Sequence, residues 1–449
     1  MLILPMAFHH RLLVIAFLAT SMTGLFLPRI AYGAASYVCP FLGDEKRRQL
    51  DEMTQGNDGW FFRINNDFRE DFTLYPETAA YLSRLAHALE AHGTTLVMIP
   101  LPVRAMAGHV SLNRSIPVQE DFNNRAALHS YHAYIQALEK AGLIAVNLAS
   151  SEADLNPDHY FRRDIHWTPE GARATAEKTA RTLKGLPRYA SLHPASYETR
   201  RTGEATMRGK TLQEIERLCS SPVPAESFPV YETRLKASGA QALFGTGDAA
   251  SVLVGTSYSD MDMFNFMGFL SQYSGLAIAN YAIGAGELFN AMISYVSAPE
   301  FVQTHPPFLL WEMPGHYNIN IGSAASFRQI IPAISGDCAN KAVAANEFEV
   351  KEGKGGTLLT IAPEKNVSGS SYYLSLASDT VSLATFTLEM EYADGDGEWF
   401  TIDRSQHFRN HGRFFVELSD DIGSALTSVT LHDLDYIDAH LEVRLCKAT

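Results

Sequence analysis

The stretch Ser251-Val252-Leu253-Val254-Gly255-Thr256-Ser257-Tyr258-Ser259 decides how this chain is expected to fold and react. It begins as an apolar run typical of a buried strand, and the helix-like run Met263–Leu270 follows it. A serine at such a strand-to-helix turn has its hydroxyl at the carboxyl end of a sheet, beside free N–H groups of the helix. Those groups can stabilise an oxyanion, so the pattern predicts a nucleophilic Ser257. A loop serine that only caps the following helix is the alternative.

A base for this serine lies upstream, in Arg163-Asp164-Ile165-His166-Trp167. Asp164 can accept the ring N–H of His166, which leaves the second ring nitrogen free to deprotonate a serine. The two motifs complement each other, because the first contains a candidate nucleophile and the second contains a base with its orienting acid. Together they predict a serine-dependent acyl-transfer enzyme.

A metal site is the other interpretation of the Asp-x-His motif, since Asp158 and His159 are close by in sequence. Such a site would need further histidine or carboxylate ligands, and no two of the four cysteines are near each other. We therefore expect no metal ion.

Length and composition are those of an ordinary globular protein with two or three domains: 449 residues, 46% of them apolar and 19% charged. Residues 1–33 depart from this, with Arg11, the apolar run Leu12–Leu27 and small residues up to Ala35. This pattern predicts a secretory signal peptide cleaved near residues 33–35, an uncleaved anchor being the alternative. We therefore expect an exported, periplasmic protein.

The charge balance narrows the class of partner. Without residues 1–33 the chain has 34 basic and 50 acidic residues, a net charge of −16. That balance argues against nucleic acid as a partner, although it leaves room for a local basic groove.

Four cysteines remain after the signal peptide, and an even number in an exported chain implies two disulfides with three possible connectivities. The spacing favours Cys39–Cys219 and Cys338–Cys446, each joining the start of a domain to its end.

Two compositional regimes divide the mature chain. Up to about residue 330, apolar runs alternate with amphipathic helical patterns, which predicts an α/β domain whose mostly parallel sheet is flanked by helices. Beyond Cys338, short alternating strands separated by glycine-rich turns predict a β-sandwich. The expected organisation is a signal peptide over 1–33, an α/β domain over 36–337 and a β-sandwich over 338–449.

The chain resembles the periplasmic alginate O-acetyltransferases of the AlgX/AlgJ group, which are SGNH-hydrolase-like. The matching residues are Arg163–Thr168, Gly255–Ser259 and Asn265-Phe266-x-Gly268-Phe269. The resemblance implies an SGNH-hydrolase-like α/β domain with Ser257 as nucleophile, His166 as base and Asp164 as its orienter. It also implies acetyl transfer to mannuronate hydroxyls of an anionic, alginate-like polysaccharide, followed by a carbohydrate-binding sandwich. A periplasmic enzyme would not meet acetyl-CoA, so we expect no cofactor and a membrane protein as the acetyl donor. We also expect other proteins of the secretion complex as partners, and a monomeric chain.

Further site residues are candidates from their chemistry. Backbone N–H groups at Ser257–Tyr258, with the amide of Asn265 or Asn318, are candidates for the oxyanion hole. Aromatic rings can stack on sugars and basic groups can pair with uronate carboxylates. The candidates for substrate binding are Trp399, Arg404, Arg409, Arg413, Lys365, His316 and Tyr317.

Two other functions fit the same residues. A polysaccharide acetylesterase would use the same triad with water as acceptor, because the groove rather than the triad selects the acceptor. A non-catalytic scaffold that escorts polymer through the periplasm would need no triad at all.

Overall fold

The structure is a computed structural model that describes residues 39, 53–219, 222–236 and 251–448. The signal peptide expected over residues 1–33 lies outside this range. Among the described residues, no helix has both the length and the apolar character needed to cross a membrane.

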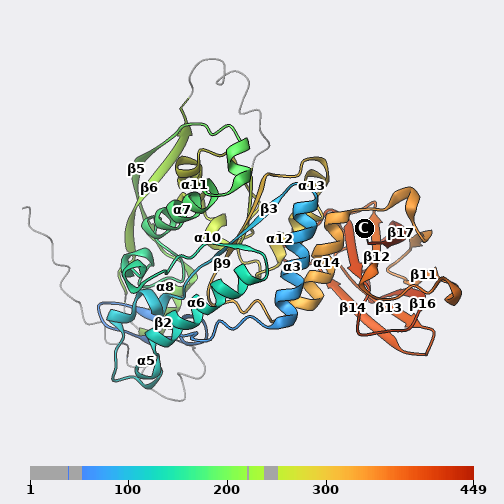
Figure 1. Cartoon of the computed structure of the whole chain (residues 1–449). Helices are drawn as coiled ribbons and strands as arrows, with labels where there is room; N and C mark the ends of the chain where they lie inside the picture. The colour runs from blue at the N-terminus through green and yellow to red at the C-terminus, as the bar shows by residue number, and fades with distance from the viewer. Residues whose placement is uncertain (1–38, 40–52, 220–221, 237–250, 449) are drawn as a thin grey trace, which may run out of the picture. The chain divides into compact units, whose positions relative to one another are not determined.

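A five-stranded parallel sheet forms the centre of the first part of the chain (Figure 1). Its spatial order is β4-β3-β9-β7-β8. The strands span Ile144–Ala145 (β4), Thr95–Pro100 (β3), Phe308–Met313 (β9), Ser251–Val254 (β7) and Ile278–Asn280 (β8). Each coincides with an apolar run, and β9 and β7 are buried along their whole length. The predicted α/β fold class is confirmed.

Helices flank the sheet (Figure 1). One group is α7 (Pro169–Lys184) with α11 (Phe266–Ser274), which pack on each other. A second is α3 (Pro76–Ala91), α12 (Asn290–Val296) and α14 (Ser323–Ser335). Other helices are α2 (Ile64–Asp67), α4 (Arg104–Ala107), α5 (Pro117–Asp121), α6 (Asn124–Lys140), α8 (Lys210–Cys219), α10 (Ser257–Asp260) and α13 (Pro299–Gln303).

The start of α7 shows why these helices form where they do. Thr168 precedes it in extended conformation and accepts a hydrogen bond from the N–H of Gly171 at 3.2 Å. Pro169 occupies the first turn, where its missing N–H costs nothing. The capped start of α7 therefore fixes the backbone at Thr168, two residues after His166.

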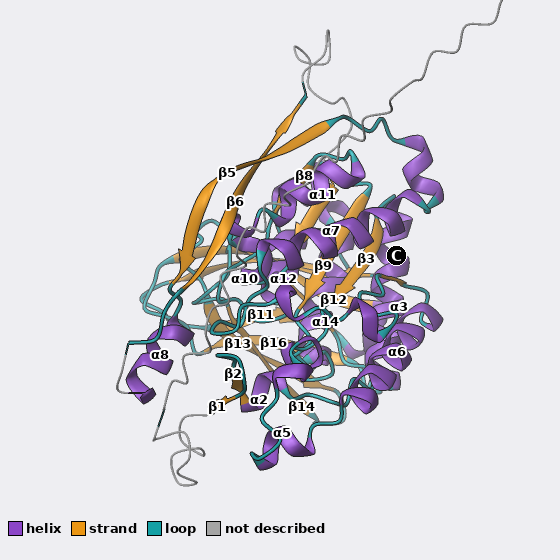
Figure 2. Cartoon of the chain, turned by 90° about the vertical axis from the view of Figure 1, so that its left-hand side faces the viewer, coloured by secondary structure: helices purple, strands orange, loops and turns teal. Residues whose placement is uncertain are grey.

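A long two-stranded ribbon lies outside the central sheet (Figure 2). It pairs β5 (Tyr197–Met207) with β6 (Glu226–Leu235) in antiparallel register. A second, short hairpin pairs β1 (Met53–Gln55) with β2 (Phe61–Arg63). The alternation of apolar residues does not predict the ribbon, because most side chains of β5 are exposed and polar.

The last part of the chain consists of two four-stranded antiparallel sheets. Their orders are β10-β17-β12-β15 and β11-β16-β13-β14, and their inner side chains form one apolar core. This agrees with the predicted sandwich. The strands span Ala344–Val350 (β10), Gly356–Thr360 (β11), Tyr372–Ser378 (β12), Thr385–Tyr392 (β13), Gly397–Asp403 (β14), Arg413–Glu417 (β15), Leu426–His432 (β16) and Ala439–Lys447 (β17).

Ion pairs and disulfides fasten these parts. Arg328 of α14 pairs with Glu398 of β14 and donates to the carbonyl of Glu417 at 2.7 Å. Arg84 of α3 pairs with the buried carboxylate of Glu417. Both predicted disulfides are present, Cys39–Cys219 and Cys338–Cys446. The exact domain boundaries remain a prediction.

Candidate active site

Ser257 is the first residue of α10, directly after the turn that ends β7. Thr256 precedes it in extended conformation, and its side-chain oxygen accepts from the N–H of Tyr258 at 3.4 Å. The turn also needs Gly255, because a Cβ there would come within 2.5 Å of a carboxylate oxygen of Glu312. The local sequence therefore places the serine hydroxyl at the carboxyl end of the sheet.

Ser257, His166 and Asp164 form a connected chain of hydrogen bonds. Nε2 of His166 lies 2.8 Å from Oγ of Ser257, and Nδ1 lies 2.5 Å from Oδ1 of Asp164. A carboxylate only accepts hydrogen bonds, so Nδ1 carries the proton and Nε2 is free to take the serine proton. Burial acts to raise the pKa of Asp164, but the hydrogen bonds and charge of His166 outweigh it and hold this pKa below its usual range. Asp164 is therefore an ionised orienter of the imidazole.

The segment that carries Asp164 and His166 closes on itself. The N–H of Phe161 donates to the carbonyl of His166 at 3.1 Å, and Tyr160 and Trp167 form an antiparallel bridge. The N–H of His166 also donates to Asp164 Oδ1 at 3.0 Å. These contacts set the backbone on both sides of the base.

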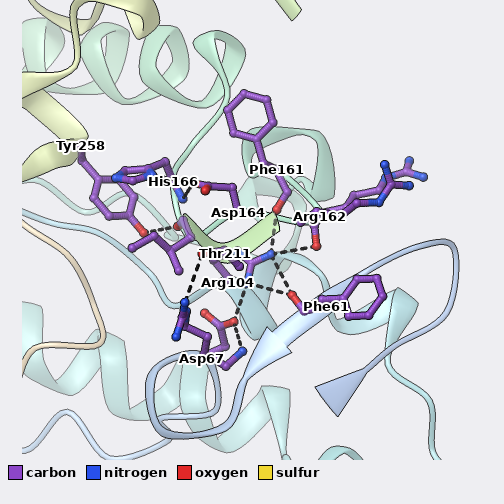
Figure 3. A network of polar contacts seen from close by, with 12 residues as sticks. Phe61, Asp67, Arg104, Phe161, Arg162, Asp164, His166, Thr211 and Tyr258 are labelled. Carbon is purple, nitrogen blue, oxygen red and sulfur yellow. Dashed lines mark hydrogen bonds and ion pairs between the residues drawn. The ribbon is translucent and has the colours of Figure 1, made fainter. Parts of the chain in front are cut away.

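The side chain of Arg104 binds the backbone of this segment and holds it in place (Figure 3). Its guanidinium donates to the carbonyls of Phe161 at 2.7 Å and Phe61 at 3.2 Å. It also pairs with Asp67 at 2.5 Å, and both side chains are buried. Burial raises the pKa of Asp67, and the Arg104 charge acts against that rise. The pair thus joins β2, α4 and the Asp164 segment at one point.

Glu312 is a site residue that sequence reasoning missed. It lies on β9, beside β7, with none of its surface exposed. Its carboxylate accepts from the N–H of Thr256 at 2.9 Å, from the Thr256 hydroxyl and from the hydroxyl of Ser259 at 3.0 Å. A carboxylate inside the otherwise apolar run Phe308–Met313 was the signal that could have found it.

Tyr258 supports the histidine through its side chain. Its ring lies 5.0 Å from the His166 ring, and its hydroxyl donates to the carbonyl of Ile165. Its backbone N–H faces the Thr256 side chain, as described above. A role of that N–H in an oxyanion hole remains a prediction.

The two candidate amides have structural partners. Asn265, in left-handed conformation, donates through Nδ2 to the hydroxyl of Thr233 on β6 at 3.0 Å. Asn318 accepts through Oδ1 from the N–H and the amide of Asn320, which shapes the loop after β9. The suggestion that either amide completes the oxyanion hole remains a prediction.

His316 and Tyr317 lie on that same loop, and their rings are 4.4 Å apart. Burial lowers the pKa of His316 to about 4, and the guanidinium groups of Arg69 and Arg63 lower it further. Arg69 fixes the loop by donating to the carbonyl of Gly315 at 3.1 Å and to that of Tyr317. Substrate binding by His316 and Tyr317 remains a prediction.

The half-buried His316 makes the stability of the protein sensitive to acid. Its folded pKa of about 4 lies below the unfolded value of 6.5, so its stabilising contribution is present above pH 6.5 and is lost as pH falls toward 4. As the pH falls from 6.5 to 4, the wild type should lose about 3 kcal/mol more unfolding free energy than His316→Asn loses. Chemical denaturation of both proteins at several pH values measures it. Parallel pH curves for the two proteins would contradict it.

Trp399 is 58% exposed on β14, and its ring lies 5.0 Å from the ring of His432. Its cross-strand neighbour is Glu389, which pairs with His432 at 2.8 Å. Lys365, also on the sandwich, donates to the carbonyl of Val343 at 3.0 Å. Ligand binding by Trp399 and Lys365 remains a prediction. Because its indole is uncharged, Trp399 would contribute stacking to such binding.

The prediction that Arg404 pairs with uronate carboxylates is wrong. Arg404 is only 4% exposed, donates to the carbonyl of Arg413 at 2.8 Å and lies over the Phe414 ring at 4.7 Å. Burial lowers the pKa of its guanidinium to about 9. The side chain packs inside the molecule and cannot reach a polymer.

Arg409 and Arg413 contact the first part of the chain. Arg409 donates to the carbonyl of Ala282 at 3.1 Å, and Arg413 donates to that of Ser297 at 3.4 Å. The cluster of basic residues around position 409 therefore joins the sandwich to the elements after β8. Substrate binding by these two residues remains a prediction.

The parallel sheet, with its serine at the end of β7, places the first part of the chain among the SGNH-hydrolase-like α/β domains. Residues 53–315 match the family described as "SGNH hydrolase-like domain, acetyltransferase AlgX", and the chain belongs to this family.

Relatives and a solved structure agree with this assignment. The chain is 29% identical over 375 residues to the alginate biosynthesis protein AlgX of Pseudomonas aeruginosa, covering 82% of this chain and 77% of that protein. It is 28% identical over 253 residues to the probable alginate O-acetylase AlgJ of Pseudomonas syringae, covering 54% and 62%. The solved structure of Pseudomonas aeruginosa AlgX has a TM-score of 0.79 at 24% identity, over 92% of this chain and 98% of that one, which shows a shared fold.

Proposed function

We propose that the chain is a periplasmic O-acetyltransferase that acetylates mannuronate hydroxyls of alginate or a similar exopolysaccharide. The observation that carries this is the Ser257–His166–Asp164 hydrogen-bond chain at the carboxyl end of the sheet. The family is described as an acetyltransferase, and the relatives reported above are named for alginate biosynthesis or as alginate O-acetylases.

The mechanism follows from the geometry. His166 Nε2 takes the hydroxyl proton as Ser257 Oγ attacks the acetyl carbonyl, and Asp164 stabilises the imidazolium that forms. The carbonyl re-forms, the bond to the donor breaks, and His166 returns the proton to the departing group. A sugar hydroxyl then attacks the acetyl-serine with His166 again as base, giving the sugar acetate and free Ser257.

A positive group against the loop of His316 suits a uronate acceptor. Arg69 donates to main-chain carbonyls on the His316 loop and forms no ion pair with the other described residues. A polyanion approaching a mature chain of net charge −16 is repelled at long range, so its attraction must come from such local positive groups. In this proposal Arg69 supplies one of them.

The compartment and the partners follow from the same proposal. Two disulfides fit an oxidising compartment, which for an alginate-type pathway is the periplasm. Acetyl-CoA does not reach that compartment, so the proposed donor is a membrane acetyl-carrying protein of the secretion complex.

Acceptor choice tests the proposal. Purified mature protein is given p-nitrophenyl acetate as a surrogate donor, with oligomannuronate present or absent, and both acetylated oligosaccharide and free acetate are quantified by mass spectrometry. We expect acetylated oligomannuronate to be the main product. Release of acetate alone would identify an acetylesterase. If neither product formed, the chain would be a non-catalytic binding scaffold.

Trp399→Ala should weaken oligomannuronate binding by roughly 5–30-fold, about 1–2 kcal/mol, because it removes an exposed stacking surface. The salt dependence of binding should change little, since the indole is uncharged. Isothermal titration calorimetry at two salt concentrations measures both quantities. Tyr436→Ala is the matched control, because Tyr436 is an exposed aromatic side chain elsewhere on the sandwich. Equal affinities for the wild type and Trp399→Ala would remove Trp399 from the polymer site.

A further inference from the structure

The turn that carries Ser257 rests on a single buried carboxylate. Glu312 contacts donors on both sides of the nucleophile: the N–H and hydroxyl of Thr256 before it, and the hydroxyl of Ser259 after it. Gly255 leaves the space that the carboxylate fills. Among the described residues, Glu312 forms no ion pair, so its hydrogen bonds alone compensate its burial.

We propose that Glu312 is a positioning residue that fixes the Gly255–Ser259 turn and so holds Ser257 Oγ within reach of His166 Nε2. This inference rests on the proposed role of Ser257 as nucleophile. Glu312 acts through the turn, without touching the reacting atoms.

The chemistry of a carboxylate explains why this residue type suits the position. An ionised carboxylate only accepts hydrogen bonds, so it can satisfy all three donors at once. Hydrogen bonds to an ionised acceptor are also roughly twice as strong as those between neutral groups. The Thr256 hydroxyl that donates to Glu312 accepts in turn from Tyr258, which extends the same chain of contacts into α10.

Burial raises the pKa of Glu312 to about 7, and the donors from Thr256 and Ser259 limit that rise. Measurements at about pH 8 therefore examine mainly the ionised form. A fold that needed only a filled space here would accept an apolar side chain at lower cost.

Glu312→Gln tests the proposal because glutamine has the same shape but one of its two polar atoms is a donor. At least one contact in the turn then pairs donor with donor or changes its direction. We expect the second-order rate of Ser257 sulfonylation by phenylmethylsulfonyl fluoride to fall on the order of 10²-fold, since small misplacements of reacting groups have effects of this size. With p-nitrophenyl acetate, kcat should fall and KM should stay nearly unchanged.

Glu417→Gln is the matched control. Like Glu312, Glu417 is a buried glutamate. It accepts hydrogen bonds from Arg84 and lies on β15, away from the turn. We expect it to lower Tm without changing the labelling rate of Ser257. If Glu312→Gln fails to fold, Thr256→Val and Ser259→Ala each remove one donor, and each should slow labelling by about tenfold.

The outcomes separate the inference from the proposed function. Wild-type labelling at Ser257 together with an unchanged rate in Glu312→Gln would overturn the inference alone. An equal loss of labelling in Glu417→Gln would overturn it too, because general destabilisation would then explain the effect. A wild-type protein that is not labelled at Ser257 would overturn both.

Discussion

Ser257→Ala is expected to abolish acetyl transfer to oligomannuronate while leaving the fold and polymer binding nearly intact. The variant loses the oxygen that carries the acetyl group in the proposed mechanism, so His166, although still paired with Asp164 at 2.5 Å, has no proton to take. We expect a fall of at least about 10⁴-fold in kcat/KM, as for other serine triads. Quantification of acetylated oligosaccharide and circular dichroism of the variant measure the two parts of this result.

His166→Ala and Asp164→Asn supply the comparison for that result. Both should be several orders of magnitude slower than wild type, and neither should slow a protein that already lacks Ser257, because the three residues act as a unit. Ser259→Ala, two residues after Ser257, is the matched serine control and should lose only about tenfold, because it removes a single donor to Glu312. Transfer by Ser257→Ala at the wild-type rate would remove this serine from the mechanism.

Arg104→Met is the substitution with the largest expected effect on stability. It leaves the buried Asp67 carboxylate and the carbonyls of Phe61 and Phe161 without their shared donor. Breaking a buried ion pair from one side costs about 3–5 kcal/mol, so urea denaturation should show a loss of this size. Activity should fall as well, because Phe161 belongs to the segment that orients Asp164.

Arg181→Met is the matched control for that measurement. Arg181 pairs with Glu177 on the exposed face of α7, where its side chain is 64% exposed. A surface pair of this kind contributes about 0.3–0.5 kcal/mol. If both variants lost the same small amount, the Arg104 network would not be the support of the catalytic segment.

The local pattern predicted much of the fold and the triad. All five parallel strands coincide with apolar runs, and Thr168 with Pro169 marks the start of α7. The Asp164–His166 pair and Ser257 were recognised because each motif has a local chemical signature. Their meeting across 91 positions depends on long-range contacts of the Asp164 segment, such as those from Arg104 to Phe161 and from Tyr258 to Ile165, which no local pattern contains.

The features that sequence reasoning missed have separate physical causes. Charged residues were taken to be exposed, but Arg404 and Glu312 are buried because hydrogen bonds and a ring contact compensate them. The β5–β6 ribbon has polar side chains over much of both strands, so it lacks the alternation that marks a half-buried strand. The helix α14 contains Pro332 near its end, and a proline inside a helical pattern weakens the prediction of a helix.

The segment from Tyr160 to Trp167 has a consequence for protein engineering. It contains both the proposed base, His166, and its proposed orienting acid, Asp164, and its ends are joined by a backbone bridge and by the hydrogen bond from Phe161 to His166. A designer could therefore transplant the pair as one short cassette into another parallel-sheet scaffold. Such a scaffold needs an arginine beneath the cassette and a serine at the end of a neighbouring strand, so new acyl-transfer sites could be built with few substitutions.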